Sequence, residues 1–243
     1  MTVIGLANTS SVSVSADQAT APGTYTITAT ASGFGPYTTP TVTVTQPYIT
    51  LYYDNSSVGA GMHRDTFYLN LSNLPTGGLT VTFASSDANV ATVTPSVTIP
   101  STQSGAYYSI KGLKVGSAKI TASATGWAPS TITIDVVAPT FVFNGLQTSR
   151  TVNGTANSFT VYAYTPGCGY CDTANADVTV TFSVVSSPAG IETVTPATVK
   201  ILANTNVSST SANADPPTGA GTYNIRATSP GFTDGISSSV TVT

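Results

Sequence analysis

The chain of 243 residues is poor in charge: charged residues make up 7% of it, where about 25% is usual. The formal net charge is −3 and the seven Lys and Arg residues never cluster, so the sequence argues against nucleic acid as a partner. No apolar run of about 18 residues occurs, which predicts that the chain does not span a membrane.

The first predicted strand belongs to a pattern that occurs three times. In Gly23–Ala29 apolar residues alternate with threonines, and a Gly-aromatic pair follows. A period of two indicates a half-buried strand, and the flanking glycines indicate turns. The pattern returns at Gly116–Ala122, 93 residues later, and at Gly221–Ala227, a further 105 residues later. Both spacings are close to the roughly 100 residues of an immunoglobulin-like sandwich, so the sequence predicts an all-β chain of tandem sandwiches.

Residues 1–46 are predicted to be the C-terminal half of such a module. Thr2–Thr9 aligns without a gap on Thr198–Thr205, which in the last module follows roughly 55 residues of earlier strands. Without a front half, the apolar faces of the remaining strands are expected to be uncovered. These faces carry Tyr25, Ile27, Val42 and Val44.

Two explanations of the half-module stay open. The chain is an excerpt of a longer array, or a strand or half-module of another chain completes the fold by strand addition. The start of the chain also lacks the charged and apolar regions of a signal peptide. An exported protein would therefore be a processed product or a fragment.

Two prolines mark the starts of the next modules. Pro47 and Pro139 each precede an alternating apolar strand, and proline suits a linker or an edge because it has no N–H to donate to a ladder. The sequence therefore predicts full modules at 47–138 and 139–243, joined by brief linkers with a limited hinge.

The second module carries the most specific motif. Two apolar strand faces are predicted, at Phe67, Leu69 and Leu71 and at Leu79, Val81 and Phe83. A Ser-Ser turn and the run Val90-Ala91-Thr92-Val93 follow, and the repeat at Gly116 comes later. This combination, over about residues 80–125, resembles the bacterial Ig-like group 2 family of the invasin and intimin type. Phe83 stands where the family has Trp, and Thr94-Pro95 replaces its usual turn glycine. The resemblance implies an extracellular or cell-surface spacer or adhesive module.

The third module contains the only unusual chemistry of the chain. Its loop from Thr165 to Asp177 is longer than the equivalent loop of the second module and holds both cysteines, Cys168 and Cys171. A redox Cys-x-x-Cys needs a βαβ context that is missing here. A structural zinc needs four ligands, and His63, the only histidine, lies in another module.

We therefore predict a local Cys168–Cys171 disulfide that stiffens an exposed loop and fits an oxidising compartment. In an immunoglobulin-like arrangement this loop faces the joint with the second module, where it could fix the angle between the modules.

Aromatic residues give two further hypotheses. The Gly-aromatic pairs of the three copies carry Phe34, Trp127 and Phe232, and their recurrence favours packing between modules over carbohydrate stacking by Trp127. Sugar binding would need several coplanar exposed rings. Tyr52, Tyr53, Tyr107 and Tyr108 are the candidates, although neighbouring tyrosines in a strand usually place one ring inward and one outward.

No catalytic set can be assembled, because His63 stands alone and no Gly-x-Ser-x-Gly elbow occurs. The sequence thus predicts a protein that is not an enzyme and has no cofactor and no metal. Its expected function is a structural or adhesive segment of an extracellular filament, surface protein or appendage, with neighbouring modules or other copies as partners. The alternatives are a module that binds a surface glycan or other ligand, and an accessory region of a larger secreted enzyme.

Overall fold

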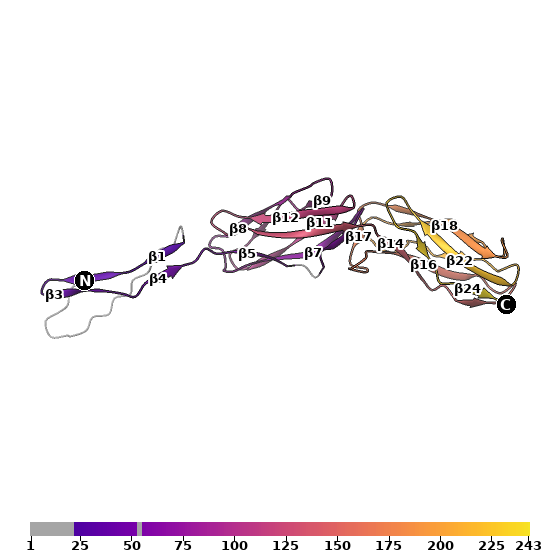
Figure 1. The fold of residues 1–243 in the computed structure, drawn as a ribbon, viewed down its shortest axis with the longest axis horizontal. Helices are drawn as coiled ribbons and strands as arrows, with labels where there is room; N and C mark the ends of the chain where they lie inside the picture. The colour runs from indigo at the N-terminus through magenta and orange to yellow at the C-terminus, as the bar shows by residue number, and fades with distance from the viewer. Residues whose placement is uncertain (1–21, 53–54) are drawn as a thin grey trace.

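The protein is an elongated row of β-structures. A computed structural model describes residues 22–52 and 55–243, and all regular elements among these residues are β-strands. A thin two-stranded ribbon lies at the N-terminal end, and two sandwiches follow end to end (Figure 1). The predicted fold class is confirmed: tandem immunoglobulin-like β-sandwiches, of which the N-terminal one is incomplete within the described residues.

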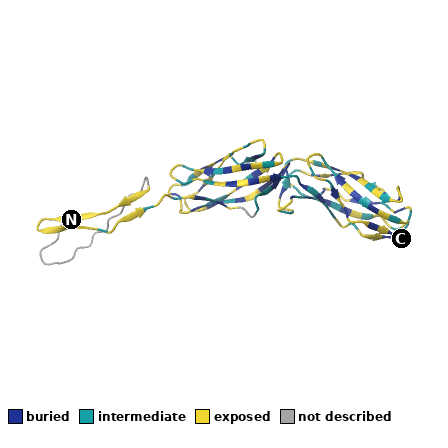
Figure 2. Ribbon diagram, viewed as in Figure 1, coloured by how far each residue is buried: buried dark blue, intermediate teal, exposed yellow. Residues whose placement is uncertain are grey.

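The N-terminal part consists of two short ladders. β1 (Gly23–Tyr25) pairs antiparallel with β4 (Val42–Val44), and β2 (Thr28–Ala31) pairs with β3 (Phe34–Thr38). The first repeat copy is thus split between two strands, where the sequence predicted one. These strands are exposed almost throughout (Figure 2), because a two-stranded ribbon has no second layer to cover an apolar face. The aligned segment at residues 2–9 lies outside the described residues.

The second module is a sandwich of two sheets. One sheet has the strand order β5-β7-β11-β9, and the other has the order β6-β13-β12-β8-β10. The strands of the first sheet are β5 (Ile49–Tyr52), β7 (Met62–Leu71), β11 (Gly105–Gly112) and β9 (Ala91–Val93). Those of the second are β6 (Ser57–Gly59), β13 (Ser130–Val137), β12 (Gly116–Ser123), β8 (Leu79–Ser85) and β10 (Ser96–Ile99).

The third module repeats this order. One sheet runs β14-β16-β21-β19 and the other β15-β24-β22-β18-β20, with β23 beside β22. The first sheet contains β14 (Thr140–Asn144), β16 (Asn157–Tyr164), β21 (Ala212–Ala214) and β19 (Val194–Thr195). The second contains β15 (Ser149–Arg150), β24 (Val240–Val242), β22 (Gly221–Thr228), β18 (Val178–Ser187), β20 (Thr198–Ile201) and β23 (Gly235–Ile236). The two sandwiches therefore have equivalent strand orders, as the repeat in the sequence predicts.

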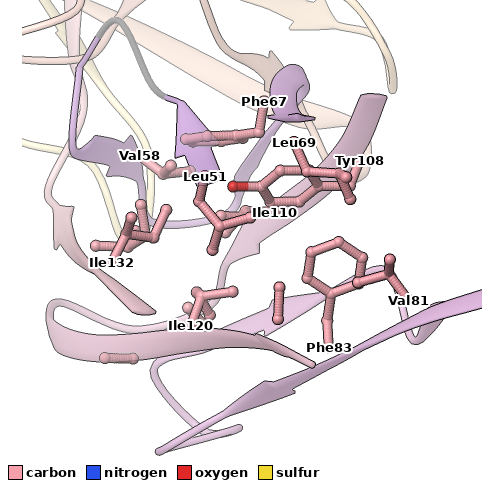
Figure 3. Packing of buried hydrophobic residues seen from close by; sticks show 14 of the residues in the cluster. Leu51, Val58, Phe67, Leu69, Val81, Phe83, Tyr108, Ile110, Ile120 and Ile132 are labelled. Carbon is pink, nitrogen blue, oxygen red and sulfur yellow. The ribbon is translucent and has the colours of Figure 1, made fainter. Parts of the chain in front are cut away.

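The core of the second module follows the predicted period of two. Phe67, on β7, is 1% exposed, and buried and exposed residues alternate along most strands (Figure 2). Tyr108 lies between Phe67 and Phe83, with ring centroids 5.6 and 4.7 Å away (Figure 3). Among the described residues the buried Tyr108 hydroxyl has no hydrogen-bond partner, and burial raises the pKa of Tyr108 well above its ordinary value. In the described residues this hydroxyl is therefore a buried polar atom without a partner, which costs free energy.

The third module contains a buried ion pair next to its last strand. Arg150 pairs in register with Val242 of β24, and its Nη1 donates to Glu192 Oε2 at 2.6 Å and to the Tyr223 hydroxyl at 3.0 Å. Its Nη2 donates to three backbone carbonyls. Desolvation raises the pKa of Glu192 above its ordinary value, although the Arg150 charge opposes the shift.

Candidate functional site

The joint between the second and third modules is the most elaborate polar site in the described part of the chain. The long loop of the third module, residues 165–177, leaves β16 and returns at β18. Within it, β17 (Thr173–Ala174) pairs antiparallel with the first residues of β7, Thr173 with His63 and Ala174 with Met62. A strand of the third module is therefore part of a sheet of the second (Figure 1).

The added strand takes a free stretch of sheet edge. On one side, β7 pairs with β11 along most of its length. On its other side β5 covers only Tyr68–Leu71, and β17 covers Met62 and His63. Since an unpaired edge presents free N–H and C=O groups, β17 satisfies backbone groups that the second module's own strands leave open.

The strand is also held by its own module. The Ala174 N–H donates to the Thr205 carbonyl at 2.8 Å, and the Asn204 N–H donates to the Ala174 carbonyl at 2.9 Å. Ala174 is fully buried. The two-residue strand is thus bonded on both sides and connects the two modules directly.

A buried ion pair lies beside this strand. Arg64 Nε of β7 donates to Asp172 Oδ1 at 2.9 Å, and the side chains of the two residues are only 5% and 0% exposed. Asp172 Oδ2 accepts from the Gly59 N–H and from the Thr165 hydroxyl, each at 2.8 Å. Hydrogen bonds to ionised groups are about twice as strong as neutral ones, and here both carboxylate oxygens accept from protein donors.

The arginine is fixed on its own side as well. Its two Nη atoms donate to the carbonyls of Asn55 at 3.0 Å and Ser57 at 2.5 Å, and its guanidinium lies 5.1 Å from the centre of the Phe67 ring. The second module therefore presents a preformed cation, and the third module supplies the anion. Such a pair adds little net stability over an apolar contact, but it strongly penalises any arrangement that leaves one charge buried alone.

Asn175 completes the polar contacts of the joint. Its Nδ2 donates to the carbonyls of Met62 at 3.0 Å and Gly112 at 3.3 Å, and its backbone N–H donates to Gly61 at 2.8 Å. His63 lies between Asn175 Oδ1 and the Thr173 hydroxyl, each 3.1 Å from a ring nitrogen. Nδ1 faces an amide oxygen, which accepts, and Nε2 faces a hydroxyl, which can donate or accept.

Apolar packing crosses the joint too. Met62 belongs by sequence to the second module, yet its fully buried side chain is part of the third module's core. Gly59 makes this possible, because a Cβ there would lie 2.7 Å from Met62 Cγ and 2.9 Å from Thr165 Oγ1. The two modules approach closely at this point because residue 59 has no side chain.

The two cysteines lie in the same loop, directly before the buried aspartate. Cys168 and Cys171 are at disulfide distance, with Cα atoms 5.9 Å apart. The turn that contains Cys168 is closed by backbone hydrogen bonds between Thr165 and Gly169. Asn55 Nδ2 of the second module donates to the Gly167 carbonyl, so the tip of the loop also contacts the second module.

Two cysteine sulfurs and a carboxylate lie close together here, but their arrangement does not resemble a metal site. Ligand atoms of Cys168, Cys171 and Asp172 lie within 4.8 Å of one another. A structural zinc takes four ligands, and both oxygens of Asp172 are already bonded to protein donors. His63, which sequence reasoning set aside as belonging to another module, lies in the joint and bonds to Asn175 and Thr173.

The three aromatic residues expected between modules have different surroundings. Phe34 is 80% exposed on β3. Trp127 packs against the core of the second module, and Phe232 stacks on Phe141 of its own module with ring centroids 4.8 Å apart. A role of these rings in packing between modules stays a prediction.

Sequence reasoning missed the residues that form the joint: Arg64, Asp172, Thr173, Asn175 and Met62. The only signal was the length of the loop and its expected position. For the tyrosines, the in-and-out expectation is confirmed for one pair, since Tyr107 is 66% and Tyr108 3% exposed. Tyr53 lies outside the described residues. In the described part of the chain, no helix is long and apolar enough to cross a membrane.

No protein-family model matches the sequence, and comparison with curated proteins finds no match. Solved structures give distant similarities. The chain is similar to the adhesin InvE of Yersinia pseudotuberculosis, with 19% identity and a TM-score of 0.35 over 81% of this chain and 58% of that one. It is similar to the D00-D0 domain of intimin, with 16% identity and a TM-score of 0.36 over 81% of this chain and 99% of that one.

Domains 5-6 of the S-layer protein SbsC give 21% identity and a TM-score of 0.35 over 80% of this chain and 95% of that one. The chain thus matches little more than half the length of the adhesin InvE. Similarities at this level support no argument about function.

Proposed function

We propose that this chain is a non-enzymatic structural segment of an extracellular filament, surface protein or appendage, in which modules at 47–138 and 139–243 form one rigid rod. The observation that supports this is the joint. A strand shared between two sheets, a buried ion pair and a shared apolar side chain all resist bending between the modules. Domains in one chain normally move relative to each other unless their interface is extensive.

A rigid rod suits a segment that holds something at a distance. The low charge and the hydroxyl-rich strands fit a passive surface, and a Cys168–Cys171 disulfide fits an oxidising compartment outside the cell. Adhesion would then depend on what the rod carries or on contacts with further modules. The exposed ribbon of residues 22–46 fits self-association, in which another chain covers it.

Rigidity is measured by residual dipolar couplings on the full chain in a weakly aligning medium. One alignment tensor is expected to fit both the second and third modules, and Asp172→Ala should require two. Asp177→Asn is the control, because Asp177 belongs to the same loop but pairs with Lys200 in an exposed position. Two independent tensors in the unmodified chain would contradict the rigid rod.

The place of the segment in a larger assembly needs the native protein. Intact mass spectrometry and electron microscopy on material isolated from its source would show its full length and whether it forms fibres. Surface labelling of intact cells tests the location. A native protein confined to the cell interior would contradict the proposal. A native protein with a catalytic domain in the same chain would also contradict it, and would favour the accessory region of a larger secreted enzyme.

A further inference from the structure

Three tyrosines form a row across the outer face of the second module. Tyr52 of β5 and Tyr107 of β11 are both direct cross-strand partners of Tyr68 of β7, which lies between them. Directly paired residues point to the same face of a sheet. Tyr52 and Tyr107 are 53% and 66% exposed. The rings of Tyr68 and Tyr107 meet edge to face, with centroids 5.0 Å apart and planes inclined at 61°, so the row offers separate ring faces and is not a coplanar platform.

The central ring of this row lies along the sheet. Gly105 of β11 pairs with Asn70 and lies diagonally from Tyr68, and a Cβ at Gly105 would overlap the ring and hydroxyl of Tyr68 and the carbonyl of Leu69. The absence of that Cβ leaves room for the Tyr68 ring to lie over the strand. Because neighbouring strands are about 4.8 Å apart, the row spans about 10 Å, which suits roughly two consecutive sugar rings.

Polar uncharged groups border the row. A shallow hollow is lined by Tyr68 and Tyr107 together with Thr102, Gln103 and Ser104, and all three of these loop residues are exposed. The lining contains no charged side chain and no large aliphatic one. Aromatic faces with nearby amide and hydroxyl groups match the two sides of a carbohydrate, which has apolar C–H faces and a rim of hydroxyls.

We propose that this tyrosine row, Tyr52, Tyr68 and Tyr107, with Gln103 at its border, is a binding site for a neutral glycan. The absence of charge in the hollow disfavours acidic sugars. It also disfavours single-stranded nucleic acid, which stacks on aromatic rings but needs Lys and Arg for its phosphates. The proposal is independent of the rigid joint, which lies at the other end of β7.

The test uses the full chain on an array of neutral oligosaccharides of glucose, mannose, galactose, xylose and N-acetylglucosamine, with pull-down on cellulose and chitin. The unmodified chain is expected to bind at least one of these probes. Tyr52→Ala and Tyr107→Ala should each weaken binding about tenfold or more, the effect of losing roughly one aromatic contact. Gln103→Ala, an exposed loop change that cannot disturb the core, should weaken it as well.

Tyr37→Ala is the matched control, because Tyr37 is 68% exposed but lies on β3, far along the chain. Thermal unfolding of each variant checks that the fold is intact. The proposal is overturned if the unmodified chain binds none of the probes, or if the tyrosine row variants and the Gln103 variant bind as it does. It is also overturned if Tyr107→Ala abolishes self-association without any glycan, since the row is then a protein interface.

Discussion

The sharpest prediction concerns the buried carboxylate of the joint. Asp172→Ala removes the acceptor of three hydrogen bonds and leaves the Arg64 guanidinium buried without a counter-charge. Breaking one side of a buried ion pair costs about 3 to 5 kcal/mol. Arg64 retains the carbonyls of Asn55 and Ser57, so we expect a value near the lower end, about 3 kcal/mol.

The loss of stability caused by this change in the third module should be measurable in the second module. Trp127 is the only tryptophan and packs against the core of the second module, so its fluorescence reports the unfolding of that module in urea. With a urea dependence of about 2 kcal/mol per M, the midpoint should fall by roughly 1 to 2 M. The loss in free energy of unfolding cannot exceed the free energy of docking between the two modules, because undocking returns the Arg64 guanidinium to water.

A double-mutant cycle with Arg64→Ala separates the pair from its surroundings. We expect the two single changes to be non-additive by about 2 kcal/mol or more, because either one alone leaves a buried charge unpaired. The control is Asp177→Asn, whose exposed pair with Lys200 should contribute less than about 1 kcal/mol. An unchanged Trp127 transition in Asp172→Ala would refute the reasoning, since the loop would then add nothing to the second module.

Three further results are expected from urea unfolding. The double variant Cys168→Ala/Cys171→Ala should lower the urea midpoint of the Trp127 transition by less than Asp172→Ala does. Closing a four-residue ring stabilises the fold by at most about 2 kcal/mol. A larger decrease than that of Asp172→Ala would mean that the disulfide itself holds the joint. Tyr108→Phe should stabilise the second module by about 1 kcal/mol, because it removes an unpartnered buried hydroxyl, whereas Tyr107→Phe on the exposed face should change little. Desolvation raises the pKa of Glu192 above its ordinary 4.5, so the stability linked to its bound proton is fully present below 4.5 and is lost as the pH rises through the folded value. The free energy of unfolding of the unmodified chain should therefore fall relative to that of Glu192→Gln as the pH rises from about 4.5, and a difference that does not change with pH would contradict this.

The strands were predictable from the sequence because their pattern depends on burial on one face. The alternation of Phe67, Leu69 and Leu71 with polar residues predicts a half-buried strand, and these residues lie on β7 with their side chains buried. The first repeat copy has the same pattern but breaks into β1 and β2. Alternation indicates a face that can be buried, whereas strand continuity also depends on a second layer, which the described part of the half-module lacks.

The position of the joint was predictable, but its chemistry was not. Placing the long loop at the pole that faces the second module follows from the order of strands in the sandwich. The partner of Asp172 does not, because Arg64 lies 108 residues away and neither residue belongs to a periodic pattern. The strand β17 has only two residues, Thr173 and Ala174, too few to show a period. Contacts of this kind depend on tertiary placement alone.

The contacts at the joint between the second and third modules need residues of both modules. The joint between residues 22–46 and the second module differs because it lacks the equivalent residues. The third module contributes the long loop with Asp172, and the second contributes Arg64, Gly59 and an open stretch of the β7 edge. The equivalent loop of the second module, residues 72–78, is shorter and has no aspartate. Within the described residues, hydrogen bonds of 22–46 connect that segment only to itself. Under the proposed rigid rod, bending between two neighbouring modules is therefore restricted where one module carries the long loop with its aspartate and the other carries the arginine and the open sheet edge.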